Sequence, residues 1–290
     1  MMNRREFLVS SMAVAGAAAV AGAPATGWAA PTKRALGVQL YTVRDQAEKD
    51  LPSVLAAIRK IGYEEVETYW NVYSHPATEL KQMINDHGLH VPSGHFNYDG
   101  LEGKFDYAAE LGLEYMICPM LPEKGRQEMD IYKKAADQFN RWGEQARKRG
   151  MRFGFHNHNY EFYHLPDKTG KMTTGYDVLM SRTDENLVCA EMDCYWITQA
   201  GLDPVEMFNR LGHRIRMLHL KDRKAGFPPS QELNDAAGHF TPVGTGTINW
   251  KSILAVAEKN QVRHMFVEQD SGGVPLENIG TSYKTLETML

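Results

Sequence analysis

Histidine and glutamate side chains are concentrated in one short stretch of the chain, HNHNYEF at residues 156–162. His156, His158 and Glu161 follow directly after the apolar run 151–155. Imidazole nitrogens and carboxylate oxygens bind divalent metal ions and transfer protons in enzyme sites. One such stretch has ordinary structural explanations, so it indicates a site only if other segments of the chain end in the same way.

Short apolar runs alternate with helical patterns from residue 36 to the end of the chain. Amphipathic spacing and Gly or Pro punctuation predict helices over residues 52–60, 78–87 and 130–149, and another that begins at Asp203-Pro204. Eight strands that alternate with helices predict one (β/α)8 TIM barrel of class α/β, which we place at residues 30–290. The predicted strands span residues 36–41, 65–68, 90–95, 115–118, 151–158, 187–193, 215–220 and 264–268.

A doubly wound open sheet is the main alternative fold. Such a sheet commonly binds phosphate at a glycine-rich turn, but no GxGxxG follows the first predicted strand and no GxxxxGK[ST] occurs. The longest irregular stretch spans residues 222–249, after the seventh predicted strand. Because long loops in compact domains are usually functional, we expect this one, with His239 and Phe240, to close over the barrel mouth or to contact a partner subunit.

Residues 1–29 resemble an export signal. Arg4-Arg5 is followed by Phe7-Leu8 and by an apolar, alanine-rich stretch over residues 9–23, with small residues before Ala30. About fifteen apolar residues are short for spanning a bilayer, which argues against a membrane anchor. The sequence therefore predicts twin-arginine export to the periplasm or beyond, with cleavage near Ala30 and no stable membrane association afterwards.

The charge and the cysteine content limit the partners of the mature chain. Its formal net charge changes from −4 to −5 when two arginines and one glutamate leave with the signal, and it has no Lys/Arg run. Nucleic acid and anionic membrane are therefore unfavourable partners, and a small molecule is expected instead. Cys118, Cys189 and Cys194 are too few for a disulfide-rich scaffold and are predicted to be buried free thiols.

Polar side chains gather at the ends of the predicted strands, where barrel enzymes place their reactive groups. Each one alone has the ordinary explanation of a packed side chain or a helix cap. Four consecutive strands, however, deliver a carboxylate or an imidazole to one rim, and so much like charge is costly unless a cation neutralises it. In chain order these residues are Gln39, Tyr41, His95, His156, His158, Glu161, Asp193, His219, Lys221, Asp222 and Glu268.

The chain resembles the sugar isomerase/epimerase family built on the xylose isomerase-like barrel, which includes inosose dehydratases and is related to endonuclease IV. The resemblance covers residues 33–290. It is carried by GVQLYTVRD, HNHNYEF, AEMDCYW, LHLKD, TPVGTGTINW and FVEQD. Endonuclease chemistry would need a basic rim facing DNA and further histidines, which argues against that activity for an acidic chain.

The resemblance implies one divalent metal ion held by Glu, Asp, His and Glu residues from the fifth to the eighth strand. Asp193, His219 and Glu268 match the last three. Relatives commonly end the fifth strand in Glu where this chain has His156, so either His156 or Glu161 supplies the first ligand. Glu161 is preferred because it preserves three hard oxygen donors suited to Mn²⁺ or Mg²⁺, with Zn²⁺ or Co²⁺ as further candidates.

A divalent cation at this rim would polarise a sugar carbonyl and stabilise the enediolate formed when the adjacent C–H bond loses its proton. His158 is the predicted base, with Glu161 as the alternative if it does not bind the metal. Reprotonation of the enediolate gives isomerisation or epimerisation, which is the predicted activity. Expulsion of a β-oxygen would instead make the protein a dehydratase or 3-keto-glycoside lyase, and a non-catalytic sugar-binding barrel is the alternative from another class.

The substrate is predicted to be an unphosphorylated keto-sugar, because exported enzymes rarely meet sugar phosphates and the chain has no phosphate loop. Tyr41 and Trp196 are expected to stack on the sugar ring, unless they only pack the barrel mouth. Lys221 is expected to hydrogen-bond a substrate hydroxyl or carboxylate, unless it only pairs with the next residue. Gln39 and His95 complete the predicted substrate-binding set, and a homodimer is left open.

Overall fold

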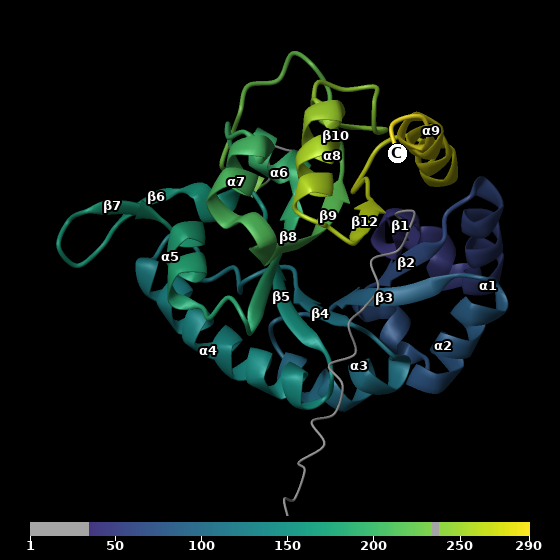
Figure 1. Ribbon diagram of the computed structural model, residues 1–290, viewed down its shortest axis with the longest axis horizontal. Coiled ribbons are helices and arrows are strands. Elements are labelled where there is room, and N and C mark those ends of the chain that lie inside the picture. The colour runs from purple at the N-terminus through teal and green to yellow at the C-terminus, as the bar shows by residue number, and fades with distance from the viewer. Residues whose placement is uncertain (1–34, 234–237) are drawn as a thin grey trace, which may run out of the picture. The chain divides into compact units, whose positions relative to one another are not determined.

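The computed structural model describes residues 35–233 and 238–290, and the predicted signal at residues 1–29 lies outside these ranges. Within the described part, eight strands close into one parallel barrel in the order β1-β12-β9-β8-β5-β4-β3-β2, which confirms the predicted (β/α)8 TIM barrel (Figure 1). The barrel strands are β1 (Leu36–Gln39), β2 (Glu65–Thr68), β3 (His90–His95), β4 (Tyr115–Cys118), β5 (Arg152–His156), β8 (Val188–Asp193), β9 (Ile215–Leu220) and β12 (His264–Val267).

Helices surround the barrel and separate its strands in the sequence (Figure 1). The helix that was predicted to begin at Asp203-Pro204 does so, because Asp203 Oδ1 accepts the Val205 N–H at 2.8 Å and Pro204 takes the first helical position. The α-helices are α1 (Arg44–Ile61), α2 (Ala77–Asp86), α3 (Phe105–Leu111), α4 (Met129–Lys148), α5 (Gly175–Arg182), α6 (Cys194–Gln199), α7 (Pro204–Leu211), α8 (Trp250–Lys259) and α9 (Pro275–Glu287).

Helix α1 begins earlier than the predicted helix at residues 52–60. Asp50 has non-helical backbone angles (φ −156°, ψ 79°) and divides α1 into two segments. The Asp50 carboxylate accepts the N–H of Ser53 at 3.1 Å and so starts the second segment, which is the predicted one. Gly62 ends it at φ +127°, a backbone conformation that glycine adopts readily.

Three strands end sooner than predicted: β12 by one residue, at Val267, and β1 and β5 by two residues each. The ends of β1 and β5 matter for the site. Strand β1 stops at Gln39, so Tyr41 lies in the short helix η1 (Leu40–Val43). Strand β5 stops at His156. The Asp193 N–H of β8 donates to the side-chain Oδ1 of Asn157 at 3.0 Å, so a side chain takes the place of the main-chain carbonyl that would continue the strand pairing. The prediction that His156 and His158 share one strand face is therefore wrong.

The lower interior of the barrel is mostly apolar, apart from the buried pair of Glu65 and His264. An added Cβ on Gly37 of β1 would lie 2.4 Å from the Phe266 ring, so a glycine is needed for that ring to fill the barrel. The polar residues of the site lie above this plug, toward the carboxyl ends of the strands. The plug consists of Tyr115, Ile117, Cys189, Met217 and Phe266.

The segment predicted as a long loop at residues 222–249 contains an antiparallel ribbon of β10 (Asp222–Arg223) and β11 (Phe240–Thr241). The buried Asp222 carboxylate holds the chain that follows the ribbon. It accepts hydrogen bonds from the N–H groups of Arg223, Gly244, Gly246 and Ile248 and from Trp250 Nε1. Asp222 therefore fixes the glycine-containing segment 244–248 and Trp250, although these residues lie more than twenty positions further along the chain.

A second hairpin, β6 (His164–Pro166) with β7 (Met172–Thr174), lies between β5 and α5. The three cysteines are free and buried, as predicted. Among the helices of the described ranges, none has the length and apolar character needed to cross a membrane.

Candidate metal centre and active site

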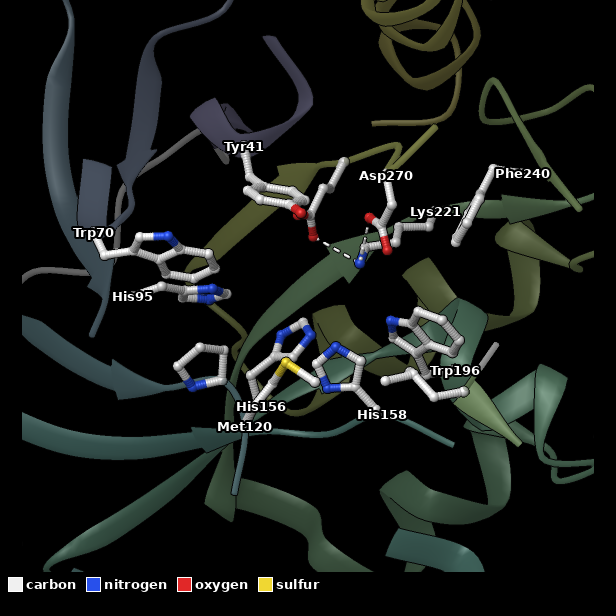
Figure 2. A pocket seen from close by; sticks show the side chains of 13 residues that line it. Tyr41, Trp70, His95, Met120, His156, His158, Trp196, Lys221, Phe240 and Asp270 are labelled. Carbon is white, nitrogen blue, oxygen red and sulfur yellow. Dashed lines mark ion pairs between the residues drawn. The ribbon is translucent and has the colours of Figure 1, made fainter. Parts of the chain in front are cut away.

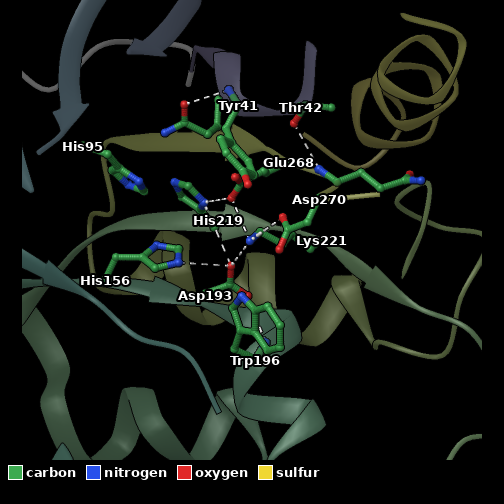
Figure 3. Close-up of polar contacts among 12 residues, drawn as sticks. Tyr41, Thr42, His95, His156, Asp193, Trp196, His219, Lys221, Glu268 and Asp270 are labelled. Atoms are coloured by element: carbon green, nitrogen blue, oxygen red, sulfur yellow. Dashed lines mark hydrogen bonds and ion pairs between the residues drawn. The ribbon is translucent and has the colours of Figure 1, made fainter. Parts of the chain in front are cut away.

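Three predicted ligand residues meet at the carboxyl ends of β8, β9 and β12. Each of Asp193, His219 and Glu268 offers one ligand atom, and these atoms lie within 4.8 Å of one another (Figure 3). His219 Nδ1 is 2.7 Å from Glu268 Oε2 and 4.0 Å from Asp193 Oδ2. All three side chains are buried. The structure therefore brings together residues that the strand ends alone suggested.

The turn from β8 into α6 fixes the orientation of Asp193. Its Oδ1 accepts the N–H of Trp196 at 2.9 Å and so caps α6. Its Oδ2 is buried without a hydrogen bond from any described residue, and it lies 3.6 Å from His156 Nε2. One carboxylate oxygen thus orders the helix while the other is directed at the two imidazoles.

The Lys221 ammonium lies among three carboxylates beside this group (Figure 3). Its Nζ is 2.8 Å from Glu268 Oε2, 2.9 Å from Asp270 Oδ1 and 3.2 Å from Asp193 Oδ2. Burial alone would lower the pKa of Lys221, but the carboxylates outweigh it and raise that pKa well above its ordinary value. In the same way, Lys221 and His219 outweigh burial and hold the pKa of Glu268 below its usual range.

The donor set fits a divalent cation. Asp193, His219 and Glu268 bring two carboxylate oxygens and one imidazole nitrogen within 4.8 Å of one another, and His156 Nε2 approaches Asp193 Oδ2 to 3.6 Å. Two oxygen and two nitrogen donors suit Zn²⁺, Mn²⁺ or Co²⁺ better than Mg²⁺, which prefers oxygen. Burial opposes a charge on His219, but Glu191, Glu67 and Glu268 outweigh it and raise the pKa of His219 well above its ordinary value. Lys221 and His219 therefore both neutralise the carboxylates, and a bound cation would replace the proton on His219.

Beneath this group lies a second one, which the sequence analysis did not assign. His95, His156, Glu191 and His219 also offer ligand atoms within 4.8 Å of one another. Glu67 Oε2 is 2.7 Å from His219 Nε2 and 3.2 Å from His95 Nε2. Burial opposes a charge on His95, but Glu67 and Glu191 outweigh it and raise its pKa to about 9.

His156 and Glu161, the two alternatives for the fifth-strand ligand, lie in different surroundings. His156 belongs to the lower group, and its Nε2 lies 3.6 Å from Asp193 Oδ2 of the upper group of Asp193, His219 and Glu268. Glu161 lies in the short helix η4 (Tyr160–Phe162), and its Oε2 accepts the N–H of His158 at 2.8 Å. Among the described residues, neither group of candidate ligands includes Glu161, and His156 is the fifth-strand residue that approaches the upper group.

A cavity of about 320 Å³ opens above the upper group (Figure 2). Of the predicted substrate-binding residues, Tyr41, His95, Trp196 and Lys221 line it, while Gln39 is buried below and donates to Glu67 Oε2 at 2.6 Å. The cavity has an aromatic wall on either side, with Trp70 beside Tyr41 and Phe240 beside Trp196 (Figure 2). The remaining lining residues are Pro119, Met120, His156, His158, Leu233, Glu268 and Asp270.

The predicted base, His158, faces this cavity. Burial, with a further contribution from the Lys221 charge, lowers the pKa of His158 well below its ordinary value, so the ring is neutral at pH 7. Its Nδ1 has no hydrogen-bond partner among the described residues, and its ring lies 5.0 Å from that of Trp196. A neutral imidazole that faces the cavity is able to accept a proton there.

Glu161 provides a pH-dependent prediction. Burial raises the pKa of its carboxyl from 4.5 to about 7. Its contribution to stability is therefore fully present below pH 4.5 and is lost as the pH rises through about 7, a difference of about 3 kcal/mol. We expect Glu161→Gln to remove this decline, so that the variant gains stability relative to the wild type between pH 5 and pH 8.

Urea denaturation at both pH values measures this difference. Glu258→Gln on α8 is the control, because Glu258 is exposed and its replacement should leave the pH dependence unchanged. Equal pH dependence in the wild type and Glu161→Gln would contradict the assignment of this titration to Glu161.

A closed (β/α)8 barrel with a buried carboxylate–imidazole group at the carboxyl ends of its strands defines a TIM-barrel protein with a candidate metal centre. The chain belongs to the xylose isomerase-like TIM barrel family, whose sequence model matches residues 55–284. This match covers most of the barrel and confirms the family indicated by the sequence motifs.

Three known proteins show how close the similarity is. An inosose dehydratase of Lacticaseibacillus casei is 33% identical over 231 residues, which are 69% of this chain and 74% of that protein. A crystal structure of a sugar phosphate isomerase/epimerase from Parabacteroides distasonis has a TM-score of 0.72 and 25% identity, covering 89% of this chain and 96% of that one. The structure of an IOLI protein with a bound zinc atom has a TM-score of 0.67 and 16% identity, covering 88% and 97%.

Proposed function

We propose that this protein is a metal-dependent lyase or dehydratase that eliminates a β-oxygen from a keto-sugar or keto-cyclitol after proton abstraction next to the carbonyl. The observation that carries the proposal is the cavity lined by His158, His156 and Glu268, which opens above the buried Asp193 and His219. The similarity to an inosose dehydratase supports elimination over the isomerisation that the sequence analysis placed first.

The upper group of Asp193, His219 and Glu268, together with His156, would hold the cation, which when bound would polarise the carbonyl and stabilise the enediolate. His158 takes the proton from the adjacent carbon. The Lys221 ammonium, which lines the same cavity, donates a hydrogen bond to the departing oxygen. The proton held by His158 passes to that oxygen as the C–O bond breaks, which restores the neutral base. The products are an α,β-unsaturated ketone and water, or an alcohol when the substrate is a glycoside.

The charge of the cavity supports an unphosphorylated substrate. The basic residues of the cavity wall are already paired. Lys221 is paired with three carboxylates, of which Glu268 and Asp270 also line the cavity, and His95 is paired with Glu67 and Glu191. A phosphate would meet this acidic wall without an unpaired basic partner among the lining residues. An isomerase or epimerase is the second candidate, supported by the similarity to the Parabacteroides distasonis structure.

Elimination and isomerisation are separated by incubating the purified mature protein in D2O with keto-cyclitols, keto-sugars and 3-keto-glycosides. The protein is loaded with Mn²⁺ or Zn²⁺, or treated with a chelator. Metal-dependent appearance of an enone absorbance, with release of water or alcohol, would support the lyase. Deuterium at carbon without loss of oxygen would establish the isomerase instead. No exchange by metal-loaded protein on the whole panel would favour a sugar-binding barrel.

We also propose that the chain is exported through the twin-arginine pathway. The support is the Arg4-Arg5 pair with the apolar stretch that follows it. Residues 1–29 fused to a reporter should direct it to the periplasm, and replacement of Arg4 and Arg5 by lysine should retain it in the cytoplasm. Periplasmic reporter in both cases would contradict the proposal.

A further inference from the structure

His219 and His156 each have one ring nitrogen directed toward the carboxyl ends of the strands and the other directed deeper into the barrel. Upward, His219 Nδ1 is 2.7 Å from Glu268 Oε2, and His156 Nε2 is 3.6 Å from Asp193 Oδ2. Downward, His219 Nε2 is 2.7 Å from Glu67 Oε2, and His156 Nδ1 is 3.1 Å from Glu191 Oε2. The two lower carboxylates are completely buried.

A bound cation decides which nitrogen carries the proton. Both nitrogens of each ring face carboxylates, and an ionised carboxylate only accepts hydrogen bonds. With a cation among the upper carboxylates, the upper nitrogen would direct its lone pair at the cation. The neutral ring would then keep its N–H on the lower nitrogen, toward Glu67 or Glu191.

We propose that Glu67 and Glu191 are positioning residues that accept the lower N–H groups of His219 and His156 and so fix the tautomers in which His219 Nδ1 and His156 Nε2 bind the metal. This inference rests on the metal centre in the proposed function. Carboxylates behind histidine ligands orient the ring and increase its basicity.

Glu67 is itself held firmly on adjoining strands. Gln39 and Ser93 are its register partners on β1 and β3. Gln39 Nε2 donates to Glu67 Oε2 at 2.6 Å, and Ser93 Oγ donates to Oε1 at 2.5 Å. The carboxylate therefore has a defined orientation before His219 contacts it.

His95 connects the two lower carboxylates. Its Nε2 lies 2.7 Å from Glu191 Oε2 and 3.2 Å from Glu67 Oε2. Its ring is stacked on that of His219, with centroids 5.2 Å apart and an interplanar angle of 8°. The Glu67 and Glu191 carboxylates thus contact the same imidazole. Glu67, Glu191 and His95 form one connected network below the candidate metal ligands, which we call the lower layer.

A second metal ion in the lower group is the alternative, since its four ligand atoms also lie close together. Metals at both levels would require His156 and His219 to lose both ring protons, because each ring would bind through both nitrogens. The proposed positioning role of Glu67 and Glu191 instead predicts one metal ion per chain. Metal stoichiometry therefore distinguishes the two arrangements.

Glu67→Gln and Glu191→Gln test the proposal, because glutamine keeps an acceptor oxygen and removes the charge. We expect each variant to bind Zn²⁺ about 10–100-fold more weakly in chelator competition. In Zn²⁺-loaded wild type, ¹⁵N-histidine spectra should show one ring protonated at Nε2 and another at Nδ1, both metal-bound. These signals should broaden or shift in the variants.

Glu65→Gln is the matched control. Glu65 lies on the same strand two residues earlier, and it pairs with His264 Nδ1 at 2.9 Å, away from the candidate ligands. This variant should lose comparable stability but keep the wild-type metal affinity. Unchanged affinity in both Glu67→Gln and Glu191→Gln, or two metal ions per wild-type chain, would overturn the positioning role while turnover still supports the proposed function. A wild-type chain that binds no metal would refute both.

Discussion

Replacing Asp193 with asparagine is expected to abolish most metal binding and most turnover. The substitution exchanges Oδ2, the candidate ligand atom, for an amide nitrogen that cannot bind a cation. The loss of metal affinity should exceed the about 100-fold upper range for residues that only support a ligand. Turnover at a fixed metal concentration should fall by about a thousandfold or more, since a main source of transition-state charge stabilisation is removed.

The fold should survive this substitution, which makes the result interpretable. Asparagine is a good helix N-cap, and its Oδ1 can still accept the N–H of Trp196. Asp203→Asn is the matched control, because Asp203 caps α7 through Oδ1 and is exposed. It should leave metal content and turnover unchanged. Wild-type metal affinity in Asp193→Asn would remove Asp193 from the candidate ligands.

Replacing His158 with glutamine should reduce kcat by about 10²–10⁴-fold while leaving the metal stoichiometry and the KM close to wild type. Glutamine has a similar reach and can form hydrogen bonds, but it cannot take up a proton at neutral pH. The expected loss is that of a missing general base. Solvent-deuterium exchange and product formation, measured on the same substrate, should fall together, because both need the same C–H cleavage.

His164→Gln is the control for this variant, since His164 is an exposed residue of strand β6. If His158→Gln exchanged solvent deuterium at the wild-type rate, His158 would only line the cavity and would not be the base. A raised KM with unchanged kcat would assign it to substrate binding. Either result would direct the search for the base to Glu161, whose pKa is raised to about 7 but which does not line the cavity.

The sequence predicted the barrel and its rim because both depend on local patterns. Apolar runs with glycine or proline stops place all eight strands close to their observed positions. The carboxyl ends of parallel strands meet at one rim, so Asp193, His219 and Glu268 could be grouped without coordinates. Strands 1 and 5 were predicted too long, because side chains of Gln39 and Asn157 replace the next main-chain acceptors there.

Glu67 and Glu191 of the lower layer were missed because they lie inside strands. Glu67 comes one residue before the end of β2, and Glu191 comes two residues before Asp193 on β8. The depth of a strand residue inside the barrel depends on the stagger between neighbouring strands. This stagger cannot be read from the positions of the strand ends in the sequence. The sequence did contain a signal for this layer. Glu65 and Glu67 lie two residues apart in a strand whose two faces are both buried in a barrel, and buried charged side chains need partners.

Lys221 and Asp222, which follow β9, have different surroundings, and this difference affects how the family can diverge and be engineered. Lys221 lies among the carboxylates of the candidate centre, whereas Asp222 anchors residues 244–250 through the N–H groups of Gly244, Gly246 and Ile248 and through the Trp250 indole. The pairing of Arg223 with Phe240 closes the base of the segment between them. Insertions or exchanges between Arg223 and Phe240 would therefore be absorbed above a fixed base, so that new substrate ranges can be selected from a randomised library without displacing Lys221.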